Sequence, residues 1–130
     1  MVNRSTVMRF DQFVDVADNN APGPPMPVMI TRKSGGVFGI TWALPSKDSD
    51  GTELTGLTKI TEVAVFQIDG VDPTVGMGPD EILAHAASDT RCAVVVAPIT
   101  PAHAGANVEV DIKPVRIGPY VICAWVEDGP

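Results

Sequence analysis

The chain has 130 residues, of which 45% are hydrophobic and 19% charged, and its formal net charge is −7. This length and composition predict one globular domain with a single core and argue against intrinsic disorder. Sixteen acidic residues against nine basic ones leave no basic stripe, so a nucleic-acid partner is not expected. Because the acidic residues are scattered, we interpret them as a solvated surface.

The sequence shows neither a secretory signal nor a membrane-spanning segment. Its first twenty residues lack the apolar stretch of about 7–15 residues that a secretory signal needs. No run reaches the ~18 apolar residues of a membrane helix, so no membrane partner is expected. If Met1 is the true start, we expect the protein to stay in the cytoplasm, or to leave it with an assembly or by lysis.

The N-terminal part differs from the rest of the chain. Phe10, Phe13 and Val14 have the i, i+3, i+4 spacing that permits one short amphipathic turn of helix. Five of the nine residues from Asn19 to Pro27 are Pro or Gly, which indicates a stiff, extended linker. We divide the chain into an arm and linker over 1–26 and one domain over 27–130, with a disordered tail as the alternative for the arm.

From Pro27 onward, apolar residues alternate with a period of two, most clearly over 37–44 and 106–114. In both segments the large apolar side chains fall on one face, as in a strand that covers a core. The expected core-facing residues are Phe38, Ile40, Trp42 and Leu44 in the first segment and Val108, Val110 and Ile112 in the second.

Further strands are predicted at 27–33, 59–68, 91–99 and 119–128, which are rich in β-branched residues. Segment 80–88 is ambiguous. Pro79 and two acidic residues are suited to a helix start, but the surrounding strands favour a short edge strand, which we prefer. About seven strands joined by Gly- and Pro-rich turns predict an all-β, two-sheet antiparallel sandwich without a helix.

Three stretches resemble one family of sandwich domains. "ITWALP" places a core tryptophan before a proline, "DGTELTGL" follows as a polar loop, and "APITPAHAGANVEVDIKPV" is similar to a strand, a leucine–x–proline turn and the next strand. Together they resemble the fibronectin type III module of bacteria and tailed phages, with Ile99 and Pro101 at the turn. The resemblance covers roughly 27–128 and implies an immunoglobulin-like sandwich.

The resemblance departs at one position. The family's sixth strand starts with a tyrosine, whereas the strand that we count as sixth starts with Asn107 and Val108. Tyr120, the only tyrosine, lies in the last predicted strand.

The polar loop offers a weak candidate for a metal site. Asp48, Asp50 and Glu53 lie close in sequence, but the closing glutamate of an EF-hand is missing. Asp-Gly is also common in plain turns, which is the interpretation we prefer. We therefore expect no metal there.

No residue set predicts catalysis. His85 and His103 lack a neighbouring metal ligand in sequence, and the nucleophile-elbow, P-loop and dinucleotide motifs are absent. Cys92 and Cys123 belong to no CxxC pair, and two buried free thiols are preferred over a disulfide. We expect no enzymatic activity and no cofactor.

The last strand suggests a surface for binding other proteins, because it is apolar on both faces and only one face can meet the sandwich core. In the predicted topology this strand is an edge, so we expect its outer face to form an exposed docking patch. The open alternative is that the arm covers this face within one subunit. The candidate partner-binding residues are Phe10, Phe13, Val63, Val65, Val121, Cys123 and Trp125.

These features favour a non-enzymatic structural protein. From the resemblance, we expect a phage virion component, such as a capsid decoration, neck, tail or baseplate protein, assembled in the host cytoplasm. Its expected partners are capsid, neck or tail subunits in a multi-copy, symmetric homo-oligomeric assembly, with loops free to contact a host surface. The alternative is a carbohydrate- or cell-surface-binding module of a larger secreted protein, which requires exposed aromatic residues in its loops.

Overall fold

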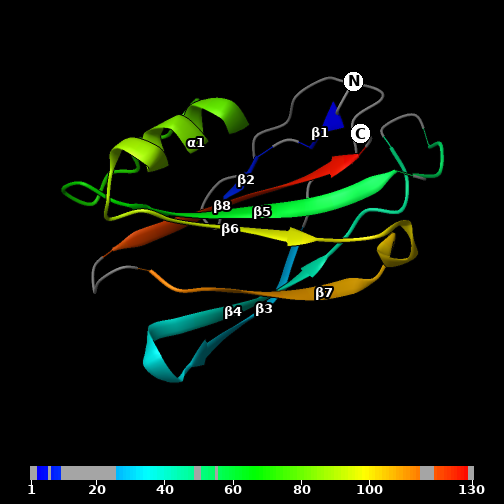
Figure 1. Ribbon diagram of the computed structural model, residues 1–130, viewed down its shortest axis with the longest axis horizontal. Helices are drawn as coiled ribbons and strands as arrows, with labels where there is room; N and C mark the ends of the chain where they lie inside the picture. Colours follow the sequence, from blue (N-terminus) through cyan, green and yellow to red (C-terminus); the bar gives the residue numbers. More distant parts are fainter. Residues whose placement is uncertain are drawn as a thin grey trace.

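A computed structural model describes residues 3–5, 7–9, 26–48, 51–54, 56–114 and 119–128 (Figure 1). The strands are β1 (Asn3–Arg4), β2 (Met8–Arg9), β3 (Met26–Lys33), β4 (Val37–Ala43), β5 (Leu57–Phe66), β6 (Ala93–Pro98), β7 (Asn107–Ile112) and β8 (Tyr120–Asp128). One α-helix, α1 (Pro79–Ser88), and two 3₁₀ turns, η1 (Ser34–Gly36) and η2 (Pro101–His103), complete the described elements.

The strands form two antiparallel sheets that pack as a sandwich, as the sequence predicted (Figure 1). One sheet has the order β3-β4-β7. The other has the order β8-β5-β6, and both β1 and β2 pair with the free side of β8. The arrangement is consistent with an immunoglobulin-like fold, in which the first, second and fifth strands share one sheet.

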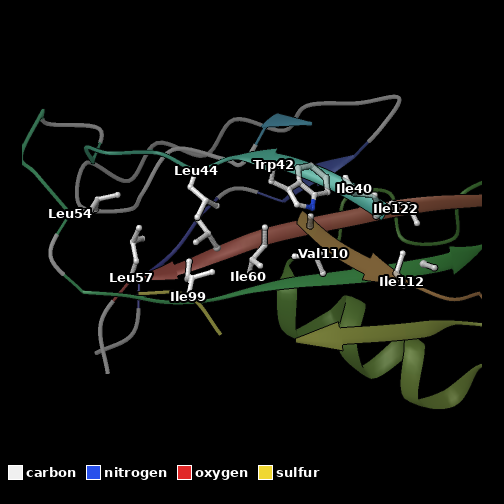
Figure 2. Packing of buried hydrophobic residues seen from close by; sticks show 13 residues of the cluster. Ile40, Trp42, Leu44, Leu54, Leu57, Ile60, Ile99, Val110, Ile112 and Ile122 are labelled. Carbon is white, nitrogen blue, oxygen red and sulfur yellow. The ribbon is translucent and has the colours of Figure 1, made fainter. Parts of the chain in front are cut away.

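The core between the sheets follows from the two-residue period. Ile40 and Trp42 of β4 are fully buried, and they pair with Val110 and Val108 of β7 across the sheet. Directly opposite residues share a face, so this sheet presents one apolar surface to its partner. Figure 2 shows how the side chains of both sheets meet in the core; its buried members are Ile40, Trp42, Leu44, Leu54, Leu57, Ile60, Ala64, Ile99, Val110, Ile112, Ile122, Ala124 and Val126.

The preferred strand at 80–88 is wrong, because α1 occupies Pro79–Ser88. Pro79 stands in the first turn, where its missing N–H costs nothing, and Asp80 follows it. Glu81 Oε1 accepts a hydrogen bond from the backbone N–H of Gly78 at 3.4 Å. These local signals outweigh the surrounding strands. Among the described residues, no helix is long and apolar enough to cross a membrane.

The expectation that the last strand is an edge is also wrong. β8 lies between β5 and the N-terminal strands, with Arg4 opposite Glu127 and Met8 opposite Ala124. The described edges are instead β6 and the short strands β1 and β2 in this sheet, and β3 and β7 in the other. β8 therefore has neighbours on both of its backbone edges over much of residues 123–128.

The core contains one acidic side chain, Glu62 of β5, whose exposure is 0%. Trp42 Nε1–H donates a hydrogen bond of 3.0 Å to Glu62 Oε2, while Oε1 has no hydrogen-bond partner among the described atoms. Burial disfavours the carboxylate and raises the pKa of Glu62 to about 8, although the Trp42 bond partly opposes this shift. The side chain is therefore protonated at neutral pH in the folded protein.

This burial predicts a pH-dependent stability. Between the ordinary pKa of 4.5 and the folded pKa of about 8, the folded state holds a proton that the unfolded state has lost. The free energy of unfolding therefore falls with rising pH in this window, by roughly 1.4 kcal/mol per unit from this group. Glu62→Gln should remove that contribution and raise stability near pH 8. Urea unfolding at pH 5 to 9 measures it.

The exposed Glu53→Gln is the matched control and should leave the slope unchanged. A Glu62→Gln protein with the same slope as the parent, or with lower stability near pH 8, would contradict this account of the core.

Candidate functional site

The five-stranded sheet has a second apolar face, on the side away from the core. Alternate residues of β5 and β8 point there, because side chains alternate along a strand. Five of them belong to one buried cluster, and none is more than 2% exposed: Val63, Val65, Val121, Cys123 and Trp125. We call these five residues the outer face.

Helix α1 covers much of the outer face. Figure 1 shows α1 on the side of the sheet opposite β3, β4 and β7. Ile82 of α1 is fully buried in the cluster, and Leu83 and Ala86 pack against it. Ala86 follows Leu83 by three residues and Ile82 by four, which places it on the same side of the helix as both. The same spacing, with Pro79 before it, is the sequence signal that could have identified α1.

The N-terminal segment, described over residues 3–5 and 7–9, adds to the cover of this face. The Ser5 backbone N–H donates to the Val126 carbonyl at 2.9 Å, and the Val126 N–H donates to Ser5 Oγ at 2.9 Å. Val7 is 5% exposed and belongs to the same buried cluster as Trp125. The segment thus satisfies backbone groups of β8 and adds one apolar side chain to the cover.

Arg4 connects the N-terminal segment to two other elements. Its Nε lies 2.9 Å from Oε1 of Glu127 on β8, and its Nη1 is paired with Asp80 at the start of α1. Glu127 is almost fully buried and also pairs with Lys59 at 3.0 Å. A buried carboxylate needs such partners, so Arg4 joins the segment, α1 and β8 in one polar network.

The predicted docking residues are therefore gathered but not exposed. Val63, Val65, Val121, Cys123 and Trp125 lie together on the outer face, as expected, yet α1 and residues 3–9 bury them. The expectation of an exposed patch is corrected, because sequence reasoning missed the helix. Phe10 and Phe13 lie outside the described residues.

Exposed large apolar side chains occur elsewhere: on the edge strands β3 and β6, and outside the strands at Ile68, Val71 and Val75. Met29 and Ile30 of β3 are 55% and 50% exposed, and Val94 and Val96 of β6 are 44% and 53% exposed. β6 offers unpaired backbone groups along its outer edge, since its described pairing is with β5 alone. Open edges of this kind are places where other chains can add.

One group of side chains of metal-ligand types lies at the C-terminal end of α1, with His85 in its last turn. His85, Asp89 and Cys92 have ligand atoms within 4.8 Å of one another. However, Arg91 donates to both carboxylate oxygens of Asp89, at 2.9 Å each, and lowers the pKa of Asp89 to about 2. Burial raises the pKa of the Cys92 thiol. A cation would have to displace Arg91, so we interpret the group as the C-terminal anchor of the helix.

The remaining described residues considered for metal binding or catalysis form turns or lie buried in the fold. Asp48 Oδ1 accepts the Thr52 N–H at 2.9 Å, and Gly51 has a φ of +85°, which fits the preferred turn. Asp50 lies outside the described residues. Cys92 and Cys123 are both buried thiols outside any disulfide, as preferred. The Thr100 N–H donates to His103 Nδ1 at 3.1 Å in the turn at η2.

Comparisons with known proteins found no match for this chain. No protein-family model matches the chain, and no curated protein or solved structure matches it either.

The contacts of the N-terminal segment predict the effect of a charge within it. Val7→Asp would bury a carboxylate in an apolar cluster, which costs several kcal/mol, so the segment should leave β8 while the sandwich stays folded. The Val126 amide then loses its bond to Ser5 Oγ. We expect its hydrogen exchange to accelerate about tenfold or more, as measured by NMR.

Val75→Asp is the matched control, because Val75 is 59% exposed and the new charge stays in water. Unchanged exchange at Val126 in folded Val7→Asp protein would show that the segment does not protect β8.

Proposed function

We propose that this protein is a non-enzymatic structural subunit that acts by binding other proteins in a multi-copy assembly. The observation that carries the proposal is a two-sheet sandwich whose edge strands β3 and β6 carry exposed apolar residues. Single exposed apolar residues are ordinary, but pairs on unpaired edges mark places for protein contact. The assembly we propose is a phage virion, with the chain as a capsid decoration, neck, tail or baseplate component.

The resemblance to fibronectin type III modules supports the virion proposal. The number of strands before Tyr120 strengthens this resemblance. Segment 80–88 is a helix, so β7 is the fifth of the six long strands and β8 is the sixth. Tyr120 therefore opens the sixth strand, where the family has its tyrosine. Its hydroxyl donates to the Arg91 carbonyl at 3.0 Å, and its ring meets that of Phe66 edge-on.

A carbohydrate-binding module is the second candidate, and the placement of aromatic residues counts against it. Sugar binding commonly uses exposed aromatic faces. Within the described part of the chain, Trp42 and Trp125 are at most 1% exposed, and Phe38, Phe66 and Tyr120 are half-buried. We therefore prefer the structural role.

Sedimentation velocity over a hundredfold range of concentration tests whether copies associate. We expect larger species as the concentration rises. Val94→Thr with Val96→Thr keeps β-branched residues on β6 but replaces one methyl group of each with a polar hydroxyl, and should weaken association severalfold or more. Val71→Thr with Val75→Thr, at exposed positions outside the strands, is the matched control.

A chain that remains monomeric at every concentration, and also fails to bind purified phage particles from its host, would contradict the proposed function. For the virion itself, we expect mass spectrometry of purified particles to detect the chain in many copies per particle. Neighbouring genes for capsid or tail proteins would agree with this, whereas a neighbouring glycosidase gene would favour the second candidate.

A further inference from the structure

The N-terminal segment lies in the sheet where an immunoglobulin-like sandwich has its seventh strand. β1 and β2 pair antiparallel with β8 on the side away from β5. In an immunoglobulin-like sandwich, that place belongs to the strand that follows the sixth strand along the chain. Here residues from the opposite end of the chain fill it. The strand that closes β8 is therefore connected to the sandwich through β3 and the residues before it, not through β8.

The connection is long enough to reach another molecule. Sixteen residues separate Arg9 from Met26. A chain of this length spans at most about 55–60 Å when extended. A domain of about 100 residues has a radius of gyration near 13 Å, and hence a diameter of roughly 35 Å. Chain length therefore permits residues 3–9 to pair with β8 of their own copy or of an adjacent one.

The contacts of the segment are the same in both arrangements. Ser5 bonds to Val126, and Arg4 pairs with Glu127 and Asp80, all of which belong to the sandwich or to α1. Val7 enters the cluster beneath α1. None of these partners lies in the linker, so the segment of a second copy can make every one of them. The two arrangements differ mainly in the effective concentration of the segment, which is in the millimolar range for a short tether.

We propose that the side of β8 away from β5, with the adjacent end of α1, is the acceptor site for residues 3–9 of a second copy of this chain. The segment serves as an exchangeable strand: it closes β8 within one copy when the protein is dilute, and it links neighbouring copies when an assembly concentrates them. This inference deepens the proposed function and rests on it, because an assembly supplies the high local concentration.

Engineered disulfides distinguish the two arrangements. Arg9 lies directly opposite Cys123, and opposed residues of an antiparallel pair have Cα atoms about 4.5–5.5 Å apart, which suits a disulfide. The donor copy carries Arg9→Cys, Cys92→Ala and Cys123→Ala. The acceptor copy carries Cys92→Ala and keeps Cys123. A disulfide that joins positions 9 and 123 can then form only between two chains.

The two copies are co-expressed, purified at low and high concentration, and oxidised with diamide, which accepts the two electrons and two protons that the thiols release. Mass spectrometry identifies the peptide that joins positions 9 and 123. We expect little of it in dilute protein. In the assembled state it should reach about half of the donor chains, because donor and acceptor edges are equally numerous.

A single chain with Arg9→Cys, Cys92→Ala and the native Cys123 is the control, and it should form the same link within one chain when dilute. If Arg9→Cys prevents folding, the register pair Asn3 and Asp128 replaces it, with Asn3→Cys in a donor and Asp128→Cys in an acceptor that both lack the native cysteines.

Assembly without any link between chains, together with full linkage in the single-chain control, would overturn the exchange and leave the proposed function standing. A protein that stays monomeric at all concentrations would overturn both, and the sedimentation measurement shows which case applies.

Discussion

The structure depends on one constraint: β5 and β8 are apolar on both faces. Their inner faces meet β4 and β7 in the sandwich core, where Trp42 and Ile60 are fully buried. Their outer faces carry Val63, Val65 and Trp125, and a sandwich of two sheets has nothing to place over them. A third layer is therefore required, and α1 and residues 3–9 supply it. Burying side chains of this size stabilises the fold by about 1.5–3 kcal/mol each, which explains why the chain retains a helix in an otherwise β architecture.

The same constraint explains why polar contacts join α1, the N-terminal segment and β8 around the outer face. Arg4 bridges α1 and β8, and Ser5 satisfies the backbone of β8. The cover of the outer face is thus held by local polar contacts around one apolar cluster, and one part of that cover arrives across a long linker. The N-terminal segment helps to shield the apolar outer face from solvent. In the exchange that we propose, another copy supplies the same segment. In an assembly of this kind, the contacts that cover the outer face would also link neighbouring copies.

Much of the sandwich could be predicted from the sequence, because alternation is a direct consequence of strand geometry. Ile40 and Trp42 of β4 and Val110 of β7 all face the core as expected, and the two-faced character of β8 was visible in its residues. The helix was not, because the signals at Pro79 and Glu81 are local and were outweighed by the context of strands. The strand count and the position of Tyr120 followed from that error, whereas the expected edge at β8 was wrong because β1 and β2 pair there. Cover of this face by the arm was one of the two alternatives, but its pairing with β8 and the register could not be predicted, because nothing in so short a segment specifies a partner more than a hundred residues away. The protonated Glu62 depends on burial that only the packed sheets create.

The most direct test of the central claim is the access of iodide to the two tryptophans. Trp42 lies between the sheets and Trp125 beneath the third layer, with exposures of 0% and 1%. If α1 and residues 3–9 cover the outer face, both indoles should emit at short wavelength and resist quenching in dilute, monomeric protein. If the cover is absent, Trp125 should be quenched and red-shifted while Trp42 is not. Quenching of about half of the emission in the folded monomer would contradict this description of the protein.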